Sequence, residues 1–196
     1  MSMNIVPLIS IKKGILLDGK DGNQISIDDL FKRVEKDTML YVLDLDGIEH
    51  NNPSLDLCQK LTEHCTLWMD NGPRRLDDTM DVIMAGATNI TIREELWPEL
   101  NLLDVFELTD DEIYLCINPA NAQPSQLTLS TQRDIGVVMF SQKPKIKDDI
   151  NSASILKNLT IKHKTYLYSV VSNPNSLWEE RGITGILVDL NEKTKE

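Results

Sequence analysis

Residues 40–94 carry the pattern that decides the fold, and they read LYVLDLDGIEHNNPSLDLCQKLTEHCTLWMDNGPRRLDDTMDVIMAGATNITIRE. Two short apolar runs, Leu40–Leu45 and Thr66–Met69, are each followed by a stretch in which apolar residues recur at helical spacing. A third apolar run, Asn89–Ile92, follows the second helical stretch. This alternation predicts consecutive strand-plus-helix units that build a parallel β-sheet.

The two helical stretches have recognisable ends. The first begins near Pro53 and Ser54 and repeats apolar residues at Leu57, Cys58 and Leu61. The second runs from Leu76 to Ala85, and Gly86 is suited to end it because glycine adopts a left-handed conformation without steric cost. We expect one apolar stripe of this second helix to face the sheet, made by Leu76, Met80, Ile83 and Met84. The dipeptide Asp46-Gly47, directly after the first apolar run, predicts a turn.

Upstream of this region the chain predicts one more strand and one more helix. Ile5–Ile9 is apolar throughout, as expected for a strand that is buried on both faces. Lys12–Leu17 continues in extended form, and Asp18–Asn23 supplies the turn residues of a hairpin. Ser26 is placed to cap a helix whose apolar positions are Ile27, Leu30, Phe31 and Val34.

Downstream, four further strands are expected, but the helices between them are weak. The strands are Ile113–Ile117, Ile135–Phe140, Thr165–Val171 and Gly185–Leu190. Brief helices are expected at Ser152–Leu159 and Asn175–Arg181, and no closing helix is expected after the last strand. We therefore predict one domain, residues 1–196, folded as a compact (β/α)8 TIM-type barrel with shortened or missing helices in its C-terminal half. Such barrels usually need about 250 residues, so an open, doubly wound sheet is the alternative.

Composition excludes several classes of partner. The formal net charge of -11 argues against nucleic acid, because phosphate binding needs a basic surface. No apolar run approaches the roughly 20 residues of a membrane-spanning helix. The N-terminus lacks the features of a secretory signal, so a cytoplasmic location is expected. The three cysteines are odd in number and share no CxxC spacing, which argues against a disulfide framework or a zinc site, and Cys116 is expected to be a buried thiol.

The first half of the chain resembles the histidine-biosynthesis isomerase/cyclase family, that is, phosphoribosylformimino-aminoimidazole carboxamide ribotide isomerase and its relatives. The resemblance rests on Leu40-Tyr-Val-Leu-Asp-Leu-Asp-Gly47, which is similar to the family's second strand, and on Leu67-Trp-Met-Asp-Asn-Gly-Pro-Arg74 with Ala85-Gly-Ala87, which is similar to its third unit. The opening Val6-Pro-Leu-Ile-Ser-Ile-Lys-Lys-Gly14 looks like the family's first strand. Beyond about residue 112 the resemblance rests on strand order alone. It implies a TIM barrel that binds ribulose-phosphate-type ligands at its mouth.

The chain departs from this family at the positions that carry its chemistry. The family's catalytic aspartates end strands one and five, where this chain has Ser10 and Asn118. Neither side chain titrates near neutral pH, so neither can act as a general acid or base. The family's phosphate-binding glycines are replaced by Asp70-Asn71-Gly72, Arg93-Glu94, Val170-Val171-Ser172 and Asp189-Leu190-Asn191. Carboxylates there would repel a phosphate, so we expect the ancestral isomerase reaction to be lost.

The candidate site is predicted from the C-terminal ends of the barrel strands, where TIM barrels place their chemistry. Asp44 and Asp46 are expected on one face of their strand, with Asp70 at the end of the next, and these three are the candidate catalytic residues. Arg93 and Arg74 are the expected counter-charges. The substrate-binding candidates are Ser10, Arg74, Arg93, Asn118 and Ser172. Asp44 and Asp46 could equally have a structural role, holding loops through backbone N–H groups.

Two functions from different classes remain open. The first is a barrel that has lost the isomerase activity and acts as a non-catalytic or cryptic small-molecule-binding protein, for which a homodimer would cover apolar strand edges or helix faces. The second is an enzyme of small-metabolite or one-carbon carrier biosynthesis, of the methanopterin or methanofuran type, with a re-equipped acidic site. No cofactor or metal motif is evident, although three carboxylates could accept a divalent metal.

Overall fold

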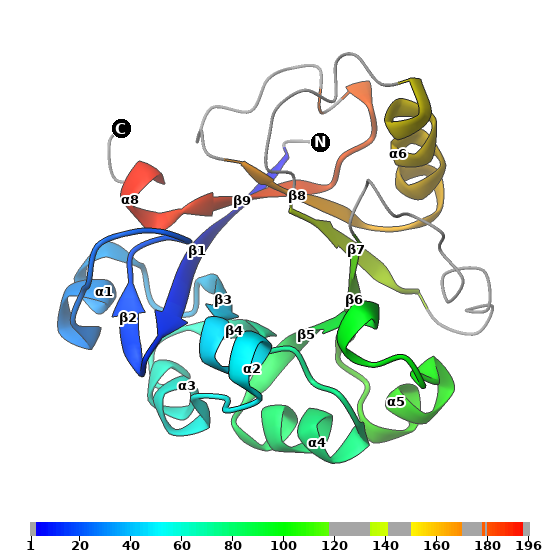
Figure 1. The fold of residues 1–196 in the computed structure, drawn as a ribbon. Helices are drawn as coiled ribbons and strands as arrows, with labels where there is room; N and C mark the ends of the chain where they lie inside the picture. The colour runs from blue at the N-terminus through cyan, green and yellow to red at the C-terminus, as the bar shows by residue number, and fades with distance from the viewer. Residues whose placement is uncertain (1–2, 118–133, 141–149, 170–177, 179, 194–196) are drawn as a thin grey trace.

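The chain forms a closed barrel of eight parallel strands (Figure 1). The computed structural model describes residues 3–117, 134–140, 150–169, 178 and 180–193. Each barrel strand pairs with the next in sequence, and the last pairs back with the first, Asn4 lying opposite Gly185 and Leu8 opposite Asp189. The strands are β1 (Asn4–Lys12), β3 (Met39–Asp44), β4 (Thr66–Asp70), β5 (Ala87–Arg93), β6 (Glu112–Ile117), β7 (Gly136–Met139), β8 (Thr165–Ser169) and β9 (Gly185–Asp189). The predicted TIM-type barrel is confirmed, and the open sheet is excluded.

Most helices lie around the outside of the barrel (Figure 1). They are α1 (Ile27–Arg33), α2 (Leu45–His50), α3 (Leu55–Leu61), α4 (Leu76–Met84), the 3-10 turn η1 (Glu94–Leu96), α5 (Leu102–Leu108), α6 (Ile150–Lys162) and α8 (Leu190–Lys193). Helices are fewer in the C-terminal half of the described chain, as predicted. The expectation of no closing helix is wrong in detail, because the four residues of α8 follow β9 directly.

Alternate residues of each strand enter two separate apolar layers. The interior of the barrel holds Val6, Leu8, Tyr41, Leu43, Trp68, Tyr114, Val138, Tyr166 and Leu187. The layer between strands and helices is larger and includes Ile9, Val42, Met69, Ile90 and Leu115. Because side chains alternate between the faces of a strand, this division fixes which way each residue at a strand end points. It is the frame on which the candidate site is placed.

A hairpin extends β1 beyond the barrel, but its turn is not where the sequence predicted. The chain reverses at Lys13 and Gly14, both with positive φ, and β2 (Ile15–Leu17) pairs antiparallel with Ser10–Lys12. The expected turn residues 18–23 form a second reversal, in which the Asp18 N–H donates to the Asn23 carbonyl at 2.9 Å. The predicted single turn is therefore two. The first was missed because it contains only one glycine and no run of polar turn residues.

Of the other local predictions, which concern α1, α2 and α4, some are confirmed and some are wrong. Ser26 caps α1 as predicted, its side chain accepting from the Asp29 N–H. The turn predicted at Asp46-Gly47 is instead the first part of α2. In α4 the predicted stripe is half confirmed, since Leu76 and Ile83 pack against the core. Met80 and Met84 are instead 45% and 78% exposed, and Thr79 is fully buried. Thr79 can be buried because its hydroxyl donates to the Arg75 carbonyl, which satisfies its one proton.

Some predictions fall largely outside the described residues. The helix expected at Asn175–Arg181 is described only in part, and the candidates Asn118 and Ser172 are not described at all. Cys116 is buried as expected, and Cys58 and Cys65 are buried too. In the part of the chain that the structure describes, no helix has both the length and the apolar character needed to cross a membrane.

Candidate functional site

The end of β4 places Asp70 inside the barrel mouth. Asp70 follows Trp68 by two residues, so both point to the interior, and the carboxylate is 0% exposed. On the neighbouring strand β5, Arg93 donates to it twice, from Nε to Oδ1 at 2.9 Å and from Nη2 to Oδ2 at 2.7 Å. Such two-point pairs are the strong form of a charged hydrogen bond. Arg93 was expected to be the counter-charge of Asp44, Asp46 and Asp70 together, and of these three it pairs with Asp70.

The Asp70 carboxylate accepts a further hydrogen bond from Tyr41. The Tyr41 hydroxyl, from β3, donates to Oδ2 of Asp70 at 2.8 Å and lies 3.3 Å from Oγ1 of Thr91. The indole N–H of Trp68 donates to the same Thr91 oxygen at 2.9 Å. The polar groups of these buried residues are thus satisfied by one another, as a buried network requires.

None of the groups around Asp70 is prepared to exchange a proton near neutral pH. Burial would lower the pKa of Arg93, but the Asp70 carboxylate outweighs this and raises it above its usual value. Burial, and then the charge of Asp70, raise the pKa of Tyr41 well above its usual value. Burial raises the pKa of the neighbouring Cys116 thiol to about 12. Arg93, Tyr41 and Cys116 are therefore expected to keep their protons near neutral pH.

Asp44 points away from Asp70. It lies on the opposite face of the sheet, since Tyr41 and Leu43 of β3 face the interior whereas Val42 faces the helices. Its Oδ1 accepts from the N–H groups of Asp46 and Gly47 at 3.1 and 3.2 Å, and its Oδ2 accepts from the Ser54 N–H at 2.7 Å. Burial raises the pKa of Asp44, although these N–H donors oppose that rise. Asp44 thus caps α2 and ties α2 to the start of α3.

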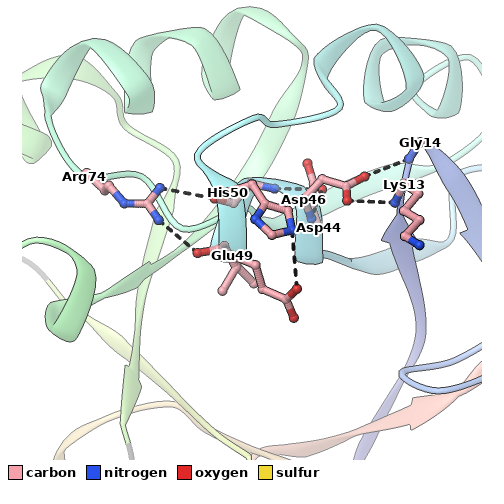
Figure 2. Close-up of polar contacts among 9 residues, drawn as sticks. Lys13, Gly14, Asp44, Asp46, Glu49, His50 and Arg74 are labelled. Carbon is pink, nitrogen blue, oxygen red and sulfur yellow. Dashed lines mark hydrogen bonds and ion pairs between the residues drawn. The ribbon is translucent and has the colours of Figure 1, made fainter.

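Asp46 holds the hairpin turn of β1 and β2 (Figure 2). Its two carboxylate oxygens accept from the N–H groups of Lys13 and Gly14, each at 2.7 Å. Both donors have positive φ, so the carboxylate fixes a backbone conformation that residue 13, having a Cβ, adopts at some cost. The predicted pair on one strand face is wrong: β3 ends at Asp44, and Asp46 belongs to a helix.

Arg74 closes the other end of α2 (Figure 2). Its guanidinium donates to the carbonyls of Gly47 at 3.2 Å and Ile48 at 2.9 Å, and to Oδ1 of Asn51 at 2.5 Å. Cationic side chains commonly satisfy the last carbonyls of a helix in this way. Arg74 therefore is not the counter-charge to the aspartates that the sequence suggested.

Ser10 faces the barrel interior and is fully buried. Its hydroxyl donates to the carbonyl of Gly19 at 2.7 Å and lies 3.3 Å from that of Lys20. Ser10 thus holds the loop of residues 18–23 over the mouth.

Three residues at the mouth were not predicted from the sequence: Lys20, Phe140 and Tyr168. Asp189 was expected only as the replacement of a phosphate-binding glycine. The Asp189 carboxylate accepts from the Lys20 N–H at 2.9 Å and from the Tyr168 hydroxyl at 3.0 Å. The Lys20 ammonium lies 5.6 Å from the centre of the Tyr168 ring and 6.0 Å from that of Phe140. Spacing along the strands could have indicated three of these side chains. Phe140 and Tyr168 lie two residues after the interior residues Val138 and Tyr166, and Asp189 lies two after Leu187, so all three continue the interior face.

Two cavities lie away from this mouth. One of about 220 Å³ is found where β6 and β7 begin and is lined partly by Asp110, Asp111, Glu112, Asp134 and Lys164. The other, of about 480 Å³, lies between α6 and residues 180–182. Neither includes the C-terminal ends of the strands. Among the described residues, no group of three or more His, Cys, Asp or Glu side chains is placed to hold a metal ion.

Comparison with known protein families finds no family model that matches this chain, and comparison with curated proteins finds no match. The fold defines the protein's class, a closed TIM-type barrel whose eight barrel strands are all parallel. Its mouth is formed by the buried pair Asp70–Arg93, the loop 18–23 and the group of Phe140, Tyr168 and Asp189.

The capping role of Asp44 gives a first testable prediction. Replacement of Asp44 by alanine is expected to lower the free energy of unfolding by about 2 kcal/mol, because a helix cap and a further buried N–H lose their acceptor. Urea denaturation followed by circular dichroism measures the change. Ser26→Ala, which removes an exposed cap, is the matched control and should cost less. An Asp44→Ala variant with unchanged stability would show that the carboxylate is not a structural cap.

Proposed function

We propose that this chain binds a small molecule at the mouth of its barrel and does not catalyse the isomerase reaction of the family its first half resembles. The observation that carries the proposal is the condition of Asp70, whose two oxygens are held by Arg93 and Tyr41 and whose side chain is 0% exposed. A general base must lie within hydrogen-bonding reach of the substrate proton. Asp70 presents no exposed oxygen to a substrate.

Ser10, at the position of the first catalytic aspartate of the family that the sequence resembles, supports the same conclusion. A serine cannot exchange protons as an aspartate does, and the Ser10 hydroxyl is used to hold the Gly19 carbonyl. Interior aromatic side chains fill the barrel below the mouth: the Trp68 ring centre lies 4.0 Å from that of Tyr114 and 4.8 Å from that of Tyr166. These features support a barrel that keeps its core and a binding surface but has lost the catalytic pair. Whether it acts as a homodimer stays a prediction.

One observation favours the enzyme as the second candidate. The Asp189 carboxyl lies at the mouth beside the Tyr168 hydroxyl, and burial raises its pKa. A carboxyl with a raised pKa is a group that an enzyme can use as an acid. The second candidate is thus an enzyme of small-metabolite or one-carbon carrier biosynthesis that uses Asp189 in place of Asp44, Asp46 and Asp70.

A ligand screen with a turnover assay separates the two functions. The panel contains sugar phosphates, amino acids, amines, pterin and furan compounds, and divalent metal salts, and the isomerase substrate of the related family is tested for turnover. At a hundredfold excess over Kd, a ligand stabilises by about 2.7 kcal/mol, which corresponds to about 5–10 °C in Tm for a chain of this size. We expect such a shift from a member of the panel, without turnover of the isomerase substrate.

Two variants locate the effect. Phe140→Leu changes the mouth and should reduce the shift, whereas Lys36→Ala, in the exposed loop before β3 at the opposite end of the barrel, should leave it unchanged. Turnover that Asp189→Asn abolishes would favour the enzyme. A folded protein that no member of the panel stabilises would contradict the binding function itself.

A further inference from the structure

The Lys20 ammonium lies against an aromatic pair at the barrel mouth. The Phe140 and Tyr168 rings are stacked, with centres 5.4 Å apart and planes at 28°. The ammonium nitrogen is 5.6 Å from one ring centre and 6.0 Å from the other, within the range of a cation–π contact. The described contacts of this nitrogen are thus the faces of two rings.

The backbone of Lys20 is fixed although its side chain is long and flexible. Its N–H donates to Asp189, and the preceding carbonyl of Gly19 accepts from Ser10. The loop is pressed so closely that a Cβ at residue 19 would lie 2.7 Å from Cγ of Asp189. The ammonium, at the end of four methylene groups, can therefore leave the rings while the loop stays in place.

The charges near the rings favour a cation over an anion. The Asp189 carboxylate contacts the Tyr168 hydroxyl at 3.0 Å. After burial, the negative charges of Asp21 and Glu192 are among the causes that raise the pKa of Asp189, so this side of the mouth is electronegative. Arg93 is also near, with its guanidinium carbon 5.5 Å from the Phe140 ring centre, but its charge is compensated by Asp70. An anionic ligand would be repelled by these carboxylates, whereas a cationic ligand would take the place of the Lys20 ammonium, which has the same charge.

We propose that Phe140, Tyr168 and Asp189 form a cage for the alkylammonium group of a small ligand, and that Lys20 occupies this cage in the free protein. The inference rests on the proposed small-molecule-binding function and specifies its ligand class. Two aromatic faces with a nearby carboxylate are a recurring way to bind ammonium groups. Lys20 is an internal competitor, which a ligand must displace.

Removal of the competitor tests the cage. Lys20→Ala keeps the backbone N–H that binds Asp189 and empties the space over the rings. Isothermal titration with choline is expected to show at least tenfold tighter binding to Lys20→Ala than to the wild-type chain. Lys36→Ala, which removes the same charge from the opposite end of the barrel, should bind choline as the wild type does. The uncharged carbon isostere of choline should bind Lys20→Ala at least tenfold more weakly than choline.

Further variants and ligands distinguish the cage from an anion site at Lys20. Phe140→Leu in the Lys20→Ala background should cancel the gain in choline affinity. If Lys20→Ala folds poorly, Lys20→Met replaces it, because methionine is uncharged and of similar length. If acetate or inorganic phosphate binds the wild type and Lys20→Ala loses that binding, Lys20 is an anion ligand and the cage is wrong, while small-molecule binding survives. If folded Lys20→Ala binds choline no better than its uncharged isostere, the cage is likewise overturned. Failure of the whole ligand panel, by contrast, would count against the proposed function.

Discussion

Replacement of Arg93 by alanine is expected to destabilise the fold by about 3–5 kcal/mol, because it leaves the Asp70 carboxylate buried without its cation. Asp70 has an exposed fraction of 0%, and Arg93 supplies two of its three side-chain hydrogen bonds. The Tyr41 hydroxyl alone cannot replace a positive charge. The cost arises from the unpaired carboxylate that remains, rather than from the intrinsic value of the pair.

Urea denaturation measures this loss, and two controls define its origin. Arg75→Ala breaks an exposed pair, in which Arg75 is 70% exposed and contacts Asp78 at 3.0 Å, and should cost about 0–1 kcal/mol. The double variant Asp70→Leu/Arg93→Met removes both charges and should recover most of the stability, since well-packed apolar residues often replace buried ion pairs without loss. A loss below about 1 kcal/mol in Arg93→Ala would mean that water reaches Asp70 and that it could serve as a base.

The Asp70–Arg93 pair could be predicted because it depends only on strand order. Both residues end strands, the strands are consecutive, and the ends of parallel neighbours meet at one edge. The barrel itself could also be predicted, because the alternation of strand and helix can be recognised from short stretches within residues 40–94. Closure by β9 against β1 then places Asp189 at the same mouth.

The direction of Asp44 could not be predicted in the same way. Barrel strands are buried on both faces and read as continuous apolar runs, so no alternation marks the interior. Val42 and Leu43 are both buried and apolar, yet one faces the helices and the other the interior. The start of α2 directly after Asp44 was equally hidden, because Asp46-Gly47 is typical of a turn.

Lys20 was missed because its position depends on residues far away in the chain. A lysine in a polar turn is usually solvated, and nothing near residue 20 indicates a contact with aromatic rings. Its backbone is fixed by Asp189, 169 residues along the sequence. The rings that its ammonium contacts, Phe140 and Tyr168, lie at the ends of β7 and β8. Only closure of the barrel brings these three elements together.

The aromatic layer beneath the mouth gives the second large prediction. Replacement of Trp68 by alanine is expected to cost about 3–5 kcal/mol, the range for removing a large aromatic side chain from a core. Trp68 is 1% exposed, and its ring contacts those of Tyr41, Tyr114 and Tyr166 at centre distances of 5.1, 4.0 and 4.8 Å. These residues come from four strands, so the indole joins opposite sides of the barrel interior.

Trp68→Phe distinguishes packing from hydrogen bonding at this position. It keeps an aromatic ring but removes the N–H that donates to buried Thr91 at 2.9 Å, so a loss of about 1–2 kcal/mol is expected. Urea denaturation and near-ultraviolet circular dichroism measure both variants. If Trp68→Ala cost no more than Trp68→Phe, the interior would be open enough to admit water in place of the ring. A water-filled interior would allow a ligand to bind more deeply than the cage at Phe140 and Tyr168. If Trp68→Ala costs more than Trp68→Phe, as expected, the interior is filled and a ligand can bind only on the surface of the aromatic layer.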